Sequence, residues 1–255
     1  MSGSKNSGKF WFLCLDARQI GRRVGMFTLF GVWIMSLVFA ITLPYWRSTI
    51  DVMVMGESAP QAIYRGDPAQ PLMSFAVNVD WGQEVLPDML RIFEKENVRV
   101  TFFVTGRWAK LYPDVLREMA EAGHEIANHG MQHDHPLQLG DWALTMHILE
   151  NQKLLTEIIG SPVQLYAPPY GEVDRRIVAT ANNLGFHTIM WTIDTIDWQE
   201  PSVETTVRRV VDKAENGAIV LMHPKPNTAK ALPQMIEGLR QKGFLLVPIG
   251  HLLKQ

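Results

Sequence analysis

From residue 73 onward, short apolar runs alternate with longer segments in which apolar residues recur at helical spacing. The short runs predict strands over residues 73–79, 100–104, 125–127, 163–166, 187–193, 218–222 and 244–247. The longer segments predict helices over residues 87–97, 112–122, 142–159, 173–184, 203–214 and 229–242, followed by a short helix at the end of the chain. The pattern therefore predicts seven alternations of strand and helix.

A continuous set of such alternations is typical of a parallel sheet covered by helices, and the fold class is therefore α/β. The expected strands, such as Val-Thr-Phe-Phe-Val, are apolar on both faces, as buried parallel strands are. The chain has no GxGxxG or Walker motif, so a closed or nearly closed barrel is favoured over a dinucleotide-binding fold. In such barrels the chemistry gathers at the carboxyl ends of the strands.

The N-terminal part has a different pattern. Residues 24–46 carry no charge and are long enough to cross a bilayer as a helix. Lys and Arg outnumber acidic residues before this run, which predicts a cytoplasmic segment over residues 1–23 and an extracellular remainder. We therefore expect an uncleaved, single-pass anchor in the cell membrane, a linker over residues 47–70 and one domain over residues 71–255. A cleaved signal peptide is the alternative.

Composition narrows the chemistry. The net charge is -2 and no basic stripe follows the N-terminus, which disfavours nucleic-acid binding. Cys14 is the only cysteine, so neither an internal disulfide nor a cysteine-rich metal site can form. A metal in this chain has to be held by histidine and carboxylate.

Polar, titratable and aromatic residues follow five of the predicted strands, and parallel strands place such residues on one rim. His129 and His133, four positions apart, can direct both rings to one point, and neutral imidazole suits zinc. The alternative is a chance pair of surface histidines. The other candidates on this rim are Asp80, Trp81, Tyr170, Asp194, Trp198 and His223.

Three motifs give the chain a family resemblance: Gly-His-Glu-Ile-Ala-Asn-His-Gly-Met-Gln-His with the histidine pair, Asp194-Thr195-Ile196-Asp197-Trp198, and Leu221-Met222-His223. Over about residues 62–255 the chain resembles the polysaccharide deacetylase family, also called the NodB-homology domain or carbohydrate esterase family 4. Trp81-Gly82 after the first strand is similar to its PdaB-like sporulation branch. The resemblance implies a distorted (β/α)7 barrel behind the transmembrane helix. It also implies a divalent metal, most often zinc, and removal of N-acetyl groups from peptidoglycan or chitin-like polymers.

Two positions depart from the family pattern. The first motif of the family carries an Asp that acts as base, and Asn78 stands there. The third motif opens with an Arg that orients this Asp, and Ala167 stands there. The two losses are consistent with each other, since an Arg without its Asp would be an unpaired cation in a half-buried cleft.

The remaining residues suggest roles around a metal. We expect Asp80 to complete the ligand set with His129 and His133, or to serve as base instead; Glu84 is a second possible carboxylate. His223 is expected to donate the proton to the leaving nitrogen, with Asp194 hydrogen-bonded to it. A plain rim histidine and a loop-capping Asp are the structural alternatives.

Aromatic side chains on the rim suit a sugar ring. Tyr170, Trp198 and Trp81 are the expected substrate-binding walls, and the backbone N–H of Tyr170 could help to hold an oxyanion. Two functions compete. The first is a metal-dependent N-deacetylase acting on cell-wall polysaccharide. The second is a catalytically impaired, glycan-binding or signalling module on the same barrel.

Overall fold

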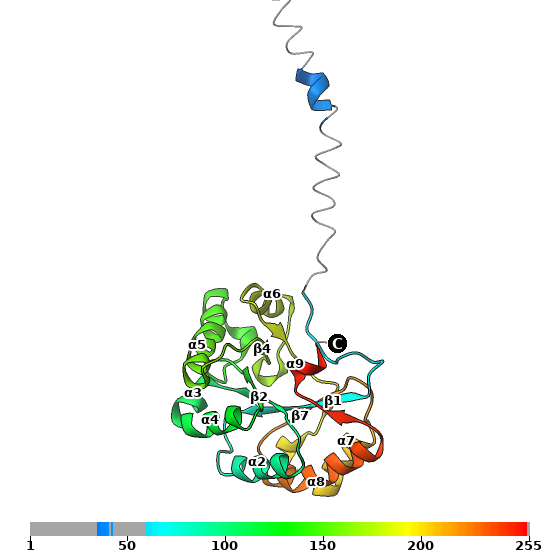
Figure 1. The fold of residues 1–255 in the computed structure, drawn as a ribbon. Helices are drawn as coiled ribbons and strands as arrows, with labels where there is room; N and C mark the ends of the chain where they lie inside the picture. The colour runs from blue at the N-terminus through cyan, green and yellow to red at the C-terminus, as the bar shows by residue number, and fades with distance from the viewer. Residues whose placement is uncertain (1–34, 41, 43–59, 254–255) are drawn as a thin grey trace, which may run out of the picture. The chain divides into compact units, whose positions relative to one another are not determined.

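The computed structural model describes residues 35–40, 42 and 60–253. The predicted anchor over residues 24–46 lies largely outside this set; residues 35–40 and 42 are helical, with exposed apolar side chains. Among the described residues, no helix has the length and apolar character needed to span a membrane. The chain divides into two units, Met1–Ser58 and Ala59–Gln255, and the second is a strand-and-helix domain (Figure 1).

The domain is built on a curled parallel sheet with the strand order β5-β4-β3-β2-β1-β7-β6 and with β8 paired to β1. The strands are β1 (Leu72–Val79), β2 (Thr101–Val104), β3 (Glu125–Asn128), β4 (Leu165–Tyr166), β5 (His187–Thr188), β6 (Ile193–Asp194), β7 (Ile219–Met222) and β8 (Leu245–Leu246). Strand β1 is central, and all of its residues are buried. The predicted α/β class with a parallel sheet is confirmed, as an open half-barrel.

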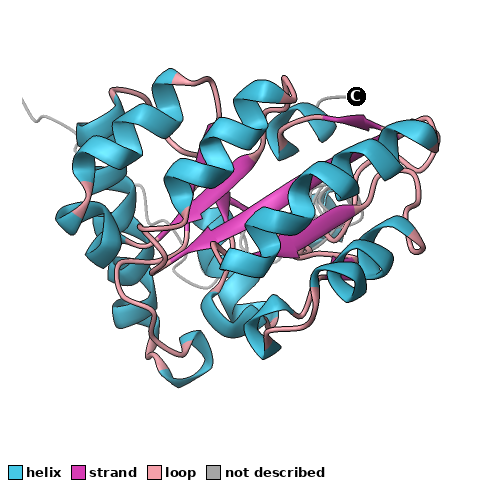
Figure 2. Cartoon of the chain, turned by 90° about the horizontal axis from the view of Figure 1, so that it is seen from below, coloured by secondary structure: helices cyan, strands magenta, loops and turns pink. Residues whose placement is uncertain are grey.

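Helices surround this sheet, as Figure 2 shows. They are α2 (Leu86–Lys95), α3 (Gly106–Leu111), α4 (Pro113–Glu121), α5 (Asp141–Ile159), α6 (Arg175–Asn183), α7 (Val203–Val211), α8 (Pro226–Gln241) and α9 (Ile249–Leu252). Short 3₁₀ turns lie at Pro136–Gln138, Pro169–Gly171 and Asp197–Gln199. Helix α3 was not expected from the apolar period. It begins because the Thr105 side chain caps it by accepting a hydrogen bond from the backbone N–H of Trp108.

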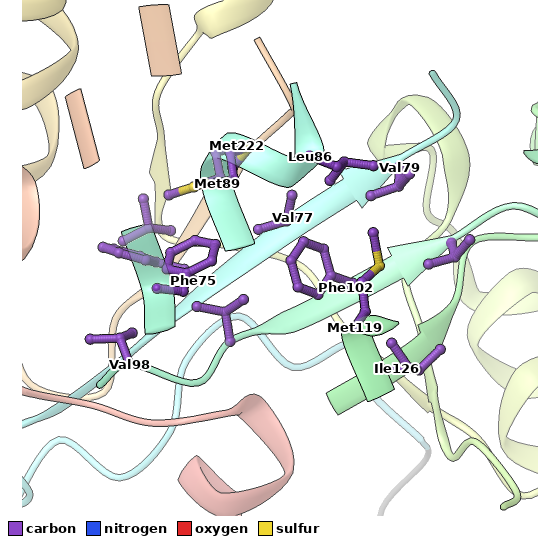
Figure 3. Close-up of a cluster of buried hydrophobic side chains, with 14 of the residues drawn as sticks. Phe75, Val77, Val79, Leu86, Met89, Val98, Phe102, Met119, Ile126 and Met222 are labelled. Atoms are coloured by element: carbon purple, nitrogen blue, oxygen red, sulfur yellow. The ribbon is translucent and has the colours of Figure 1, made fainter. Parts of the chain in front are cut away.

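The main core lies between the sheet and helices α2, α4, α5, α7 and α8. Figure 3 shows Phe75 and Val77 of β1 against Met89 of α2, with Phe102 of β2 beside them. Each of these four side chains is at most 1% exposed. Burial of one such side chain stabilises the fold by about 1.5–3 kcal/mol, so the apolar runs seen in the sequence hold the sheet in place.

The sequence prediction of one strand over residues 187–193 is wrong. The segment is split, because β5 pairs with β4 at one edge of the sheet and β6 pairs with β7 at the other. Between them the chain crosses over, and the N–H of Met190 donates to the carbonyl of Ile63 at 2.8 Å instead of to a strand neighbour.

The end of the predicted linker takes part in this arrangement. Ile63 forms a parallel bridge with Ile189, and Arg65 forms an antiparallel bridge with Ala218. Residues 60–70, which we expected to be part of the linker over residues 47–70, therefore pair with the chain just after β5 and with the chain just before β7.

Candidate active site

A cavity of about 480 Å³ lies at the carboxyl ends of the strands. Its lining residues are Asn78, Asp80, Trp81, His129, His133, Tyr170, Gly171, Trp191, Asp194, Trp198, Leu221 and His223. All eight residues predicted from the strand ends are therefore brought together. Their roles depend on the geometry of each side chain.

His129 is 1% exposed, and its Nδ1 lies 2.7 Å from the carbonyl oxygen of Ala167. Because a carbonyl only accepts, the Nδ1 carries the proton, and the Nε2 keeps its lone pair. Burial lowers the pKa of His129 to about 3, so the ring is neutral near pH 7. The His133 ring lies 5.2 Å away between centroids, and burial lowers its pKa as well. Both rings are thus in the neutral state that a metal requires.

The loop that carries these histidines is held by the Asn128 side chain and packs closely against the His147 ring. The Asn128 side chain donates to the carbonyl of Ile148 at 2.8 Å and accepts from the N–H of Gly130 at 2.7 Å. Gly130 has φ +82°, and a Cβ there would lie 1.8 Å from Nε2 of the His147 ring. Only glycine fits this close approach, so the sequence Asn-His-Gly sets the direction of the first histidine.

Asp80 is not free to join the two histidines. Its Oδ1 accepts hydrogen bonds from Nε of Arg107 at 2.6 Å and from Oγ1 of Thr105 at 2.8 Å, and its Oδ2 accepts from Nη2 of Arg107. The hydrogen bond to Asp80 raises the pKa of Arg107, so the guanidinium is charged. Within the described chain, no three His, Cys, Asp or Glu side chains are arranged to hold a metal.

The predicted metal trio of Asp80, His129 and His133 is therefore not assembled in the part of the chain that the structure describes. The two rings fit a metal, but the carboxylate is already engaged by a fixed cation. The donor set as arranged does not fit a divalent metal. Asn78, which the sequence analysis placed at the position of the family's base, is 7% exposed, and its Oδ1 has no hydrogen-bond partner within residues 60–253. The cavity floor thus carries a neutral amide in place of a charged acid.

His223 has a carboxylate partner, but it is Asp197, not Asp194 as predicted. Its Nδ1 and its backbone N both lie 2.7 Å from oxygens of Asp197. Thr228 donates to the same carboxylate at 2.8 Å, and Asp197 is 2% exposed. Asp194 ends β6 and accepts from the N–H of Ile196 at 2.7 Å, which matches the loop-capping alternative.

Aromatic side chains form the walls of the cavity. Trp81 stacks on His223 with ring centroids 5.8 Å apart, and the Lys225 ammonium lies 4.8 Å from the Trp81 ring. Tyr170 stacks on His135 at 3.9 Å. Tyr170 and Trp198 are each 56% exposed, so part of each ring is accessible to a ligand. Aromatic faces suit the apolar side of a sugar ring.

Comparisons with known proteins agree with this geometry. The sequence model described as polysaccharide deacetylase matches residues 68–189. A peptidoglycan-N-acetylglucosamine deacetylase of Bacillus cereus is 31% identical over 174 residues, which cover 66% of this chain and 81% of that enzyme. The chain belongs to the polysaccharide deacetylase family. The predicted PdaB-like sporulation branch within this family stays a prediction.

Two other proteins are also similar. YlxY of Bacillus subtilis is 35% identical over 196 residues, which cover 77% of this chain and 61% of YlxY, so the chain spans less than two thirds of that relative. The crystal structure of BA3943 from Bacillus anthracis, described as a CE4 family pseudoenzyme, has 35% identity and a TM-score of 0.76, covering 77% of this chain and 70% of that one. A mutant of BA3943 is described as having restored enzymatic activity.

For a member of the deacetylase family, the cavity can do two things. It can hold a sugar between aromatic faces, and the His223–Asp197 pair can accept or donate a proton at the ring Nε2. It lacks a free acidic group at position 78.

Three residues of the site were missed by the sequence analysis. Asp197 stands beside Trp198 in the quoted motif, so its position next to that tryptophan was an available signal. Trp191 lies on the crossover between β5 and β6, which we predicted as a continuous strand. Arg107 had no local signal, because its partner Asp80 lies 27 positions earlier in the chain.

Proposed function

We propose that this domain binds N-acetylated polysaccharide in the cavity without hydrolysing it at the rate of an enzyme. The state of the carboxylates carries this proposal. Asn78 replaces the acid that serves as base, and both oxygens of Asp80 are engaged by Arg107. An acid held in this way is a poor base and a poor metal ligand, because its lone pairs already accept charge-assisted hydrogen bonds.

The walls of the cavity support a glycan as the ligand. Trp81, Tyr170 and Trp198 line it with partly or largely exposed rings. Relatives named as peptidoglycan and chitooligosaccharide deacetylases suggest glycans with N-acetylglucosamine units. The likeness to BA3943, described as a pseudoenzyme, is a further argument for binding without turnover.

A second candidate function is N-deacetylation, a hydrolysis of a carbon–nitrogen bond that is not a peptide bond. The observation in its favour is the pair of partly exposed His223 and buried Asp197, which is suited to proton transfer. This function would need Asp80 to leave Arg107 and join His129 and His133 around a divalent metal, zinc in our sequence prediction. It would also need a base other than Asn78.

One experiment separates the two functions. The full-length protein is incubated with N-acetylglucosamine oligomers and with peptidoglycan, with and without added zinc, and both ligand binding and acetate release are measured. Binding by calorimetry without acetate release is the expected result. Acetate release that is lost in Asp80→Asn and His129→Ala would establish the deacetylase instead. Absence of binding to every glycan in the panel would refute the glycan-binding proposal.

We further propose that residues 24–46 anchor the protein in the cell membrane with the domain outside. Cys14 offers an internal control, because it would lie on the cytoplasmic side. Glu157 on α5 has a side chain that is 62% exposed, so Glu157→Cys adds an accessible thiol to the domain. A membrane-impermeant maleimide should label this thiol on intact cells and Cys14 only after lysis. Labelling of both thiols only after lysis would contradict the topology.

A further inference from the structure

Asp80 has a side chain that is only 6% exposed, and its negative charge is balanced by the positive charge of Arg107. Arg107 approaches it with two N–H groups, one to each oxygen, and Thr105 adds a third donor. This is the fork geometry in which guanidinium and carboxylate pair most strongly. The contact is a defined pair, in contrast to surface ion pairs such as Arg91–Asp88, in which the side chains are 69% and 62% exposed.

Arg107 is also fixed to the loop that carries the histidines. Its backbone N–H donates to the carbonyl of Met131 at 2.9 Å, and the N–H of Gly106 donates to the carbonyl of Gly130 at 3.0 Å. The first residues of α3 are thereby attached to the segment between His129 and His133. The guanidinium is held close to the place where a metal would have to bind all three side chains.

We infer that Arg107 takes the place of a divalent cation at Asp80. A metal and the guanidinium cannot both use the same carboxylate lone pairs, and their positive charges repel each other. Metal binding therefore requires Arg107 to move away. Its side chain is 49% exposed, so the freed guanidinium would reach water, but the bidentate pair would be lost. This inference rests on the geometry of the pair; if the proposed glycan-binding function holds, the pair keeps the cavity closed to metals and its acid neutralised.

The inference predicts that removal of the guanidinium creates a metal site. In Arg107→Met the stem of the side chain is kept and the charge and both donors are lost. We expect this variant to bind one Co²⁺ or Zn²⁺ per chain about 10- to 100-fold more tightly than the wild type, the range set by lost hydrogen bonds to a charged group. Arg107→Lys keeps the charge but not the fork, and its affinity should lie between the two.

The measurement is a titration of the chelator-treated, full-length protein with Co²⁺ or Zn²⁺ by calorimetry, together with the visible absorption of bound Co²⁺. Arg91→Met is the matched control, because it removes an exposed guanidinium from a different carboxylate, and it should bind metal as the wild type does. The melting temperature of each variant shows that the fold is retained. Adding His133→Ala or Asp80→Asn to Arg107→Met should abolish the gained affinity.

Two results would overturn the inference. One is a folded Arg107→Met that binds metal no more tightly than the wild type does. The other is a gain in metal affinity that persists when Asp80→Asn is added to Arg107→Met. The glycan-binding proposal is tested separately by calorimetry with N-acetylglucosamine oligomers in the absence of metal. If the protein binds no glycan but Arg107→Met still gains metal affinity, the glycan-binding function is refuted and the Arg107 inference stands.

Discussion

Asp197 holds His223 at two points, since its oxygens lie 2.7 Å from both the ring Nδ1 and the backbone N of that residue. The same carboxylate also accepts from Thr228. We expect Asp197→Asn to lower the free energy of unfolding by about 1–3 kcal/mol, because an amide offers only one accepting oxygen to the three donors around a buried side chain. Urea unfolding at pH 7 measures this change.

Asp194→Asn is the matched control for this prediction. Asp194 lines the same cavity, and its Oδ1 is paired with the backbone of Ile196, a contact that the amide oxygen of Asn can also make. Its cost should stay within about 0.5 kcal/mol, as for most substitutions outside buried networks. If Asp194→Asn cost more than Asp197→Asn, the assignment of Asp197 as the partner of His223 would be refuted.

The exposed rings at the cavity should contribute to glycan binding. We expect Trp198→Ala to weaken the binding of N-acetylglucosamine oligomers about 5- to 10-fold, the loss of roughly 1 kcal/mol of ring contact. Trp142→Ala is the control, because Trp142 is 77% exposed but does not line the cavity. Calorimetric titration of the two variants should show a change only in the first. Equal weakening by both would place the glycan elsewhere.

Much of the site could be predicted because parallel strands place their carboxyl ends at one rim. Residues such as Asp80, His129 and His223 follow different strands and line one cavity. This outcome depends only on strand direction, which the alternation of strand and helix already indicates. The sheet as a whole was predictable for the same reason, since its strands are apolar on both faces.

The pairing of side chains within the site could not be predicted in the same way. Arg107 reaches Asp80 from the start of α3, a short helix whose apolar spacing gives little signal. Asp194 and Asp197 lie three positions apart, and only the backbone turn at Ile196, with φ +53°, directs the second one to His223. Which side chains form a pair depends on backbone angles and on distances shorter than the spacing between residues. A sequence pattern does not contain this information.

The two departures from the family pattern, Asn78 and Ala167, are expected to be energetically linked. Asn78→Asp alone places an unpaired acid in a buried position, and Ala167→Arg alone places an unpaired cation there, since the two residues are 7% and 4% exposed. Each single variant should be destabilised, and the double variant should recover a coupling energy of about 1–3 kcal/mol. Urea unfolding of the four proteins measures this cycle. Additive effects would show that the two losses are independent.

The stability of the domain should depend on pH through His124. Burial lowers the pKa of this ring to about 4, and its Nδ1 accepts a hydrogen bond from the N–H of Val100 at 3.2 Å. The unfolded chain takes up the proton near pH 6.5, but the folded chain does not, so stability is complete above pH 6.5 and falls as the pH drops toward 4. The loss from this ring should approach about 1.4 kcal/mol per pH unit in that window.

His124→Asn tests this dependence, because an amide oxygen can accept from Val100 but does not titrate. The free energy of unfolding is measured in urea at pH 7.5, 6.0 and 5.0 for both proteins. We expect the wild type to lose more stability than the variant on acidification. Buried His129 and His147, whose pKa values are also lowered, are present in both proteins and cancel in the difference. If both proteins lost the same free energy of unfolding on acidification, His124 would not be the source of the pH dependence.

The close packing behind the histidine loop gives a last prediction, for which the chain provides its own control. Gly130 and Gly160 have nearly equal φ angles of +82° and +76°, so Ala meets similar backbone strain at both. A Cβ at Gly160 has nothing within 4 Å, whereas one at Gly130 would lie 1.8 Å from the His147 ring. Gly160→Ala should cost about 1 kcal/mol, and Gly130→Ala should cost about 1–3 kcal/mol more, the range for overpacked sites.

Because Gly130 directly follows His129, the metal affinity gained in Arg107→Met should also fall when Gly130→Ala is added, and it should be unchanged with Gly160→Ala. Equal costs of the two glycine substitutions in urea unfolding would show that the His147 ring moves aside and that the loop is not held in this way.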